Sequence, residues 1–127
     1  MSYKYTLAHG AKHNVGDFLI RDRAISLLEE YADVSEKELY SVDLVRNELS
    51  QSELDMITQT DAVLLAGGPG FQPDFYPGVY PSLAEILDAG VPVYPLGPGW
   101  KGHREDKYEF SESSKQMLRR VYNQIEF

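Results

Sequence analysis

The sequence contains no cysteine. This absence excludes disulfide bonds, thiolate metal sites and cysteine nucleophiles, although it leaves the redox compartment open. The sequence also lacks any apolar stretch close to the roughly 20 residues that a membrane-spanning helix needs, and its first ten residues do not form an apolar signal segment. We therefore expect a cytoplasmic protein without a membrane span.

Positive charge is scarce as well. Twelve Lys and Arg residues stand against twenty Asp and Glu residues, which gives a formal net charge of −8. Such a protein is not expected to bind nucleic acid or an anionic membrane.

The motifs G-x-G-x-x-G and G-x-x-x-x-G-K-[ST] are absent, so we expect no dinucleotide or P-loop cofactor. His9 and His13 are four residues apart on a strand end and a loop, with no third ligand motif nearby, and no metal site is expected.

The residues that are present can form one core. The chain has 127 residues, of which 43% are hydrophobic, with nine Tyr, five Phe and one Trp. This length and composition predict a single compact domain covering residues 1–127.

Short apolar runs alternate with helical patterns along the chain. Strands are predicted at residues 3–8, 38–43, 61–66 and 91–96, and helices at 16–31, 50–58, 81–89 and after 111. This order predicts a Rossmann-like α/β fold, in which a parallel sheet of about four strands has helices on both faces. Because residues 61–66 are almost all apolar, we expect them to form the central strand, between the strands that end at Ala8 and Leu96.

Several residues mark the ends of these elements. Pro92 and Pro95 make the last strand short or place it at an edge, and Gly90 ends the preceding helix. Helix caps are predicted at Asn14 with Asp17, at Ser50 with Glu53, and at Ser111. Core positions are predicted at Tyr31, Tyr40, Leu118, Val121, Tyr122 and Ile125.

Unusual residues concentrate in three loops that follow predicted strands. Residues 9–17, 67–72 and 97–104 hold all three histidines and the only tryptophan. In a parallel sheet these loops share one edge, where ligands bind. Each loop also has a structural interpretation: the glycines can serve tight turns, Asn14 and Asp17 a helix cap, Trp100 a partly buried position, and residues 101–107 a solvated charged loop.

One enzymatic interpretation fails. The segments 61–70 and 83–100 look like the start of a class I glutamine amidotransferase, which needs a cysteine nucleophile in the turn after the strand containing Val93 and Leu96. This sequence has Gly97-Pro98-Gly99 there, so the thiolate required for amide hydrolysis is missing.

A second resemblance covers most of the sequence. The N-V-G-D of residues 14–17, followed by a predicted helix, resembles the opening of the polysaccharide pyruvyl transferase family. The D-A-V-L-L-A-G-G-P-G of residues 61–70 and the P-V-Y-P-L-G-P-G-W of residues 92–100 are similar to that family's second and third signatures, in the same order. Pro69 departs from the Gly-Gly-Gly that members often have.

The resemblance implies two Rossmann-like domains in a glycosyltransferase-B-like arrangement, which move a pyruvyl group from phosphoenolpyruvate to a sugar hydroxyl. This chain would be the N-terminal, acceptor-side part, and the residues that hold phosphoenolpyruvate are expected in a C-terminal domain. The family's N-terminal domain usually continues with another strand, so we expect the sequence to be a truncated part of a larger enzyme. The isolated chain is expected to be inactive.

Its expected partners are a sugar or glycan acceptor and phosphoenolpyruvate in the full-length parent. No catalytic residue is assigned; His9 and His13 are candidate general bases by position. The alternative is a non-catalytic Rossmann-like binding or interaction module. The candidate substrate-binding residues are His9, His13, Asn14, Gly16, Asp17, Gly67, Gly68, Gly70, Trp100 and Arg104.

Overall fold

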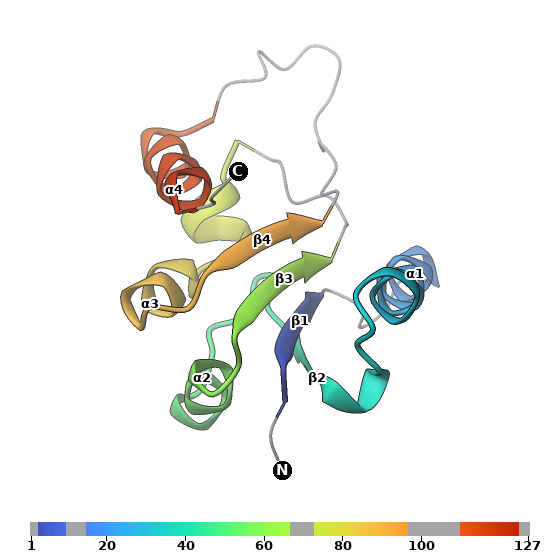
Figure 1. Cartoon of the computed structure of the whole chain (residues 1–127). Helices are drawn as coiled ribbons and strands as arrows, with labels where there is room; N and C mark the ends of the chain where they lie inside the picture. The colour runs from blue at the N-terminus through green and yellow to red at the C-terminus, as the bar shows by residue number, and fades with distance from the viewer. Residues whose placement is uncertain (1–2, 10–14, 67–72, 97–109, 125–127) are drawn as a thin grey trace.

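A computed structural model describes residues 3–9, 15–66, 73–96 and 110–124, without the side chains of residues 15–18 and 20. Within these ranges strands and helices alternate along the sequence (Figure 1). The elements are β1 (Tyr5–His9), α1 (Val15–Tyr31), the short 3-10 turn η1 (Glu36–Glu38), β2 (Leu39–Asp43), α2 (Gln51–Thr58), β3 (Ala62–Ala66), the irregular turn η2 (Phe75–Val79), α3 (Leu83–Asp88), β4 (Val93–Leu96) and α4 (Glu112–Asn123).

The four strands form one all-parallel sheet in the order β2-β1-β3-β4. The predicted α/β fold with a Rossmann-like parallel sheet is therefore confirmed. β3 pairs with β1 and with β4, as its apolar sequence predicts. β4 is four residues long and lies at the edge, which agrees with the two prolines in its segment.

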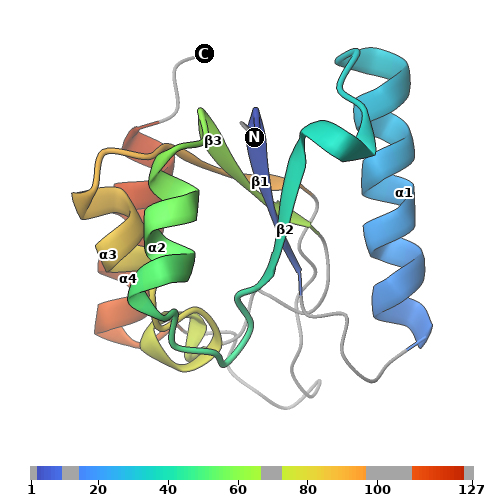
Figure 2. The same ribbon diagram turned by 90° about the horizontal axis from the view of Figure 1, so that it is seen from below.

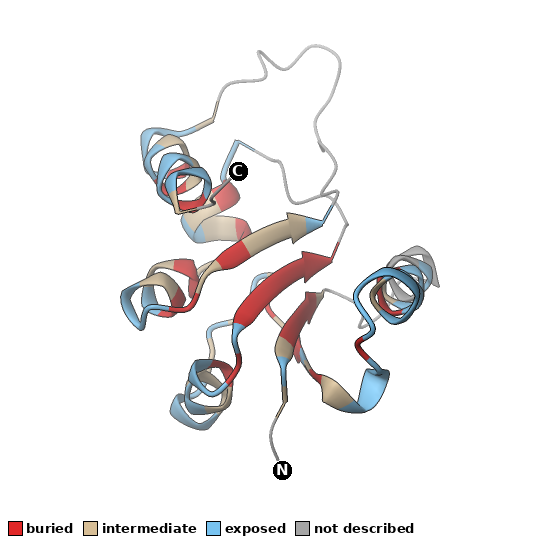
Figure 3. Ribbon diagram, in the orientation of Figure 1, coloured by how far each residue is buried: buried red, intermediate tan, exposed pale blue. Residues whose placement is uncertain are grey.

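Helices cover both faces of the sheet. In Figure 2, α1 lies on one side, while α2, α3 and α4 lie on the other. All five residues of β3 are buried, and Figure 3 shows this strand as the buried centre of the molecule. Val63 and Leu65 belong to the core under α2, α3 and α4, whereas Leu64 and Ala66 belong to the core under α1. The alternation follows from the two-residue period of a strand.

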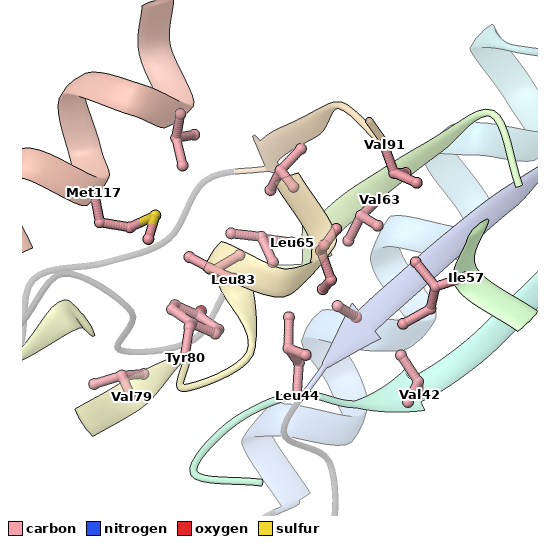
Figure 4. Close-up of a cluster of buried hydrophobic side chains, with 14 of the residues drawn as sticks. Val42, Leu44, Ile57, Val63, Leu65, Val79, Tyr80, Leu83, Val91 and Met117 are labelled. Atoms are coloured by element: carbon pink, nitrogen blue, oxygen red, sulfur yellow. The ribbon is translucent and has the colours of Figure 1, made fainter. Parts of the chain in front are cut away.

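The two cores differ in size. The larger one joins the sheet to α2, α3, η2 and α4 (Figure 4). The smaller one joins the sheet to α1 and to the segment that follows it. The larger core contains Ala8, Val42, Leu44, Ile57, Val63, Leu65, Phe75, Val79, Tyr80, Leu83, Ile86, Val91, Val93, Met117 and Val121. The smaller core contains Leu7, Ala24, Ile25, Val34, Leu39, Leu64 and Ala66.

Two predicted helix caps are confirmed. The Ser50 hydroxyl accepts a hydrogen bond from the Glu53 N–H at 3.2 Å, and a Glu53 carboxylate oxygen accepts one from the Ser50 N–H at 3.0 Å. The Ser111 hydroxyl accepts from the Ser114 N–H at 3.2 Å and so caps α4. These bonds satisfy amide groups that have no partner inside the helix. The predicted cap at Asn14 lies outside the described residues.

The predicted stop at Gly90 is also confirmed. This glycine has a φ of 85°, a conformation that costs glycine little. The Gly90 N–H donates to the Leu87 C=O at 2.9 Å, and the Val91 N–H donates to the Ile86 C=O at 3.3 Å. This pair of bonds is a Schellman motif, which ends the helix, and the backbone then continues into the next strand.

Tyr31 and Tyr122 were predicted in the core, and both predictions are wrong. Tyr31 is 76% exposed and Tyr122 is 44% exposed. At the end of α1 the backbone turns at Asp33, which has a φ of 53°, and Val34 becomes fully buried instead of Tyr31. In α4 the buried stripe runs through Ser114, Met117 and Val121, one position away from Tyr122.

The other four core predictions have different outcomes. Val121 is fully buried, Leu118 and Tyr40 are partly buried, and Ile125 lies outside the described residues.

None of the helices in the described ranges has the length and apolar character needed to cross a membrane.

Candidate functional site

The carboxyl ends of the strands lie together at one edge of the sheet. Ala8 is in register with Leu65, and Ala66 with Leu96, so β1, β3 and β4 end at nearly the same level. Figure 1 shows their arrowheads at one side of the molecule. We refer to this side as the carboxyl edge.

The strand order reverses direction between β1 and β3. After β1 the polypeptide passes to α1 on one face, and after β3 it passes to η2 and α3 on the opposite face (Figure 2). Two neighbouring strands whose connections leave toward opposite faces form a topological switch point, which is where open α/β sheets bind ligands. The segments 10–14 and 67–72, which contain Asn14 and the G-G-P-G sequence, follow β1 and β3 in the sequence.

Most candidate residues lie outside the described residues. This group consists of His13, Asn14, Gly67, Gly68, Gly70, Trp100 and Arg104. Gly16 and Asp17 lie in the first turn of α1, and the Asp17 side chain is not described. The predicted shared surface of His9, Asn14, Gly68 and Trp100 therefore stays a prediction, although the strands that precede these segments do end at one edge.

His9 is the candidate residue whose side chain the structure describes. It is the last residue of β1, is partly buried, and is in register with Asp43, the last residue of β2. Burial lowers the pKa of His9 below 6.5, and the positive charge of Arg21 lowers it further, while Asp43 opposes the shift. The lowered pKa favours a neutral imidazole at neutral pH, and a neutral imidazole can accept a proton.

Asp43 is held by the turn that follows β2. Its carboxylate accepts a hydrogen bond from the Val45 N–H at 3.2 Å, and its backbone carbonyl oxygen accepts one from the Asn47 side-chain amide at 2.8 Å. The Leu44 N–H donates to the His9 C=O at 3.1 Å, which continues the β1–β2 pairing past the end of the strands. These bonds keep a carboxylate beside His9.

Arg21 contributes the positive charge near His9. Its guanidinium lies 3.3 Å from the Asp22 carboxylate and 3.6 Å from that of Glu36, so two acidic groups already contact it. His9, Arg21 and Asp43 thus form a small charged cluster at the β1–β2 end of the carboxyl edge, which we call the His9 cluster.

Sequence reasoning identified His9 but missed Arg21 and Asp43. Asp43 was recognised only as the end of a predicted strand. Its position as the last residue of the strand beside β1 is the signal that could have found it. No group of three or more potential metal-ligating side chains occurs among the described residues.

Comparison of the sequence and its structure with models of protein families, with curated proteins and with solved structures finds no match.

Proposed function

We propose that this chain is the acceptor-side part of an enzyme similar to the polysaccharide pyruvyl transferases, and that it binds its sugar acceptor at the carboxyl edge. One observation carries the proposal. The G-G-P-G motif directly follows β3, and the N-V-G-D motif spans the start of α1, the helix that follows β1; β1 and β3 are the two strands that form the topological switch point. This order supports the proposal, because both motifs come after strands whose carboxyl ends meet where this type of sheet binds ligands.

The His9 cluster gives this proposal a chemical role. When a sugar hydroxyl replaces the phosphate on the pyruvyl carbon of phosphoenolpyruvate, the bond from that carbon to the phosphate oxygen breaks, inorganic phosphate leaves, and the hydroxyl proton must pass to a base. A neutral imidazole at His9 is suited to accept that proton, and the Asp43 carboxylate stabilises the imidazolium that results. The groups that hold phosphoenolpyruvate are expected elsewhere in the parent enzyme, so His9 acts here on the acceptor alone.

Calorimetric titration of the 127-residue protein with a panel of hexoses, and separately with phosphoenolpyruvate, tests the proposal. We expect at least one sugar to bind, phosphoenolpyruvate alone to bind weakly or not at all, and a mixture of the two to give no pyruvylated product. Substitution His9→Gln should weaken sugar binding by about tenfold, which corresponds to the loss of one polar contact worth roughly 1.4 kcal/mol.

Asp61→Asn is the matched control. Asp61 is exposed and lies at the opposite, amino end of β3, so the variant should bind like the wild type. Sugar binding that is unchanged by His9→Gln would support the alternative, a non-catalytic binding module. The absence of binding to any sugar, or turnover by the isolated 127-residue protein, would contradict the proposal.

A further inference from the structure

The outer side of α1 carries an apolar ridge. Leu19 is 64% exposed, Leu27 is 39% exposed and Tyr31 is 76% exposed. Arg23, also exposed, lies midway between the two leucines. The four residues follow one another at intervals of four, which places them along one of the rows by which helices pack against each other. We call Leu19, Arg23, Leu27 and Tyr31 the α1 ridge.

No other described element covers this ridge. The side of α1 that faces the sheet is formed by Ala24, Ile25 and the partly buried Leu28. In Figure 2 the other three α-helices lie on the opposite face of the sheet. Among the described residues, five large apolar side chains are at least 39% exposed, and three of them belong to the ridge. Such a concentration on one helix is typical of a contact surface.

Charge restricts how a second copy of the protein can cover the ridge. The protein has a net charge of −8, so two copies repel each other unless the contact brings opposite charges together. Arg23 and Glu30 are both exposed, and neither forms an ion pair with another described residue. They are seven residues apart, about two helical turns, and therefore lie on the same side of α1.

These positions are complementary to themselves. If two α1 helices pack antiparallel about the point between Arg23 and Leu27, Leu19 of one copy lies opposite Tyr31 of the other. Arg23 then lies opposite Leu27 of the second copy and within reach of its Glu30. Because the arrangement is two-fold, each contact occurs twice, as in the common symmetric dimers.

We propose that the α1 ridge is a homodimer interface in which two copies of this protein pack through antiparallel α1 helices. The contact is limited to one helix of 17 residues, about 25 Å long. It is therefore smaller than the roughly 1,200–2,000 Å² that stable interfaces bury. The dimer is accordingly weak and reversible.

Sedimentation equilibrium of the 127-residue protein over a wide concentration range tests this proposal. We expect a monomer–dimer equilibrium, which Leu19→Glu and Tyr31→Glu each abolish. Both side chains are largely exposed, so these variants should fold normally, as circular dichroism and thermal melting can verify. Arg23→Glu and Glu30→Arg should each weaken the dimer by about three- to tenfold, because two exposed ion pairs become repulsive.

Two further variants make the test specific. The double variant Arg23→Glu/Glu30→Arg restores opposite charges and should recover dimerisation. Glu29→Arg changes the net charge as Glu30→Arg does, but Glu29 lies off the ridge and its substitution should not weaken the dimer. The proposal is overturned if the protein is monomeric throughout, if the dimer survives Leu19→Glu and Tyr31→Glu, if the double variant fails to recover, or if Glu29→Arg weakens the dimer as much as Glu30→Arg.

Discussion

The side-chain amide of Gln124 forms hydrogen bonds with both backbone groups of Val93. Its oxygen accepts from the Val93 N–H at 3.2 Å, and its nitrogen donates to the Val93 C=O at 2.6 Å. Val93 lies in the edge strand β4. The C=O of the preceding residue, Pro92, points toward β3, so the backbone groups of Val93 point outward, away from β3. The next outward-facing residue, Pro95, has no N–H. Gln124, at the end of α4, thus pairs the backbone groups of an edge strand that would otherwise be open to the addition of another strand.

Replacing Gln124 with Ala should destabilise the protein by about 1–3 kcal/mol, because both backbone groups of the fully buried Val93 lose their partner. Urea denaturation of the variant and the wild type measures this difference. Gln116, exposed on the same helix, provides the control, and Gln116→Ala should change stability by less than about 0.5 kcal/mol. Equal effects of the two substitutions would show that the contact with Val93 contributes nothing.

Ser114→Ala should cost about 1–3 kcal/mol. The buried Ser114 hydroxyl accepts from the Tyr76 N–H at 3.0 Å and donates to the Tyr76 C=O at 3.1 Å, so it links α4 to η2. Ser113 also donates to the Tyr76 C=O, at 3.0 Å, but is exposed. Ser113→Ala should therefore cost clearly less in the same denaturation experiment, and the reverse order would contradict this account of the link.

Tyr80→Phe should make the protein more resistant to alkali. Burial raises the pKa of Tyr80 to about 12, whereas the phenol in the unfolded state titrates near 10. As the pH rises above 10, the unfolded state loses its proton first, and the wild type becomes progressively less stable toward pH 12. The variant lacks this contribution. Stability curves at neutral and alkaline pH check the prediction, with the exposed Tyr31→Phe as the control that should behave like the wild type.

His9 should make the protein less stable in mild acid. Because burial and Arg21 lower its pKa below 6.5 in the folded state, the unfolded state binds more protons as the pH falls below that value. Folding stability contributed by the neutral imidazole is then lost progressively as the pH falls further below 6.5. His9→Gln should show a smaller loss of stability between pH 7 and 5. A pKa at or above 6.5 in an NMR titration of the His9 ring would contradict this prediction.

Local sequence signals predicted much of the fold. The alternation of strands and helices was sufficient for a parallel sheet, and the apolar run of β3 placed that strand between β1 and β4. Ser50, Glu53, Gly90 and Ser111 marked helix ends because caps depend on residues only a few positions apart.

Features that depend on distant residues were not predictable in this way. Asp43 lies 34 positions after His9 in the sequence, and only the strand order brings the two into register. Tyr31 occupies an apolar position of a helix that has two apolar stripes, and the pattern alone does not identify which stripe is buried. Gln124 and Val93 are 31 positions apart, so nothing in the local sequence predicts their contact.

Mapping of amide chemical shifts during titration with a bound sugar tests the central claim, that the ligand occupies the carboxyl edge at the β1–β3 switch point. The account predicts the largest changes at His9 and Ala66, the last residues of β1 and β3, with smaller changes at Asp43. Lys4 and Asp61, at the amino ends of the same strands, should not respond. The largest changes at Lys4 and Asp61, with His9 and Ala66 unaffected, would contradict it.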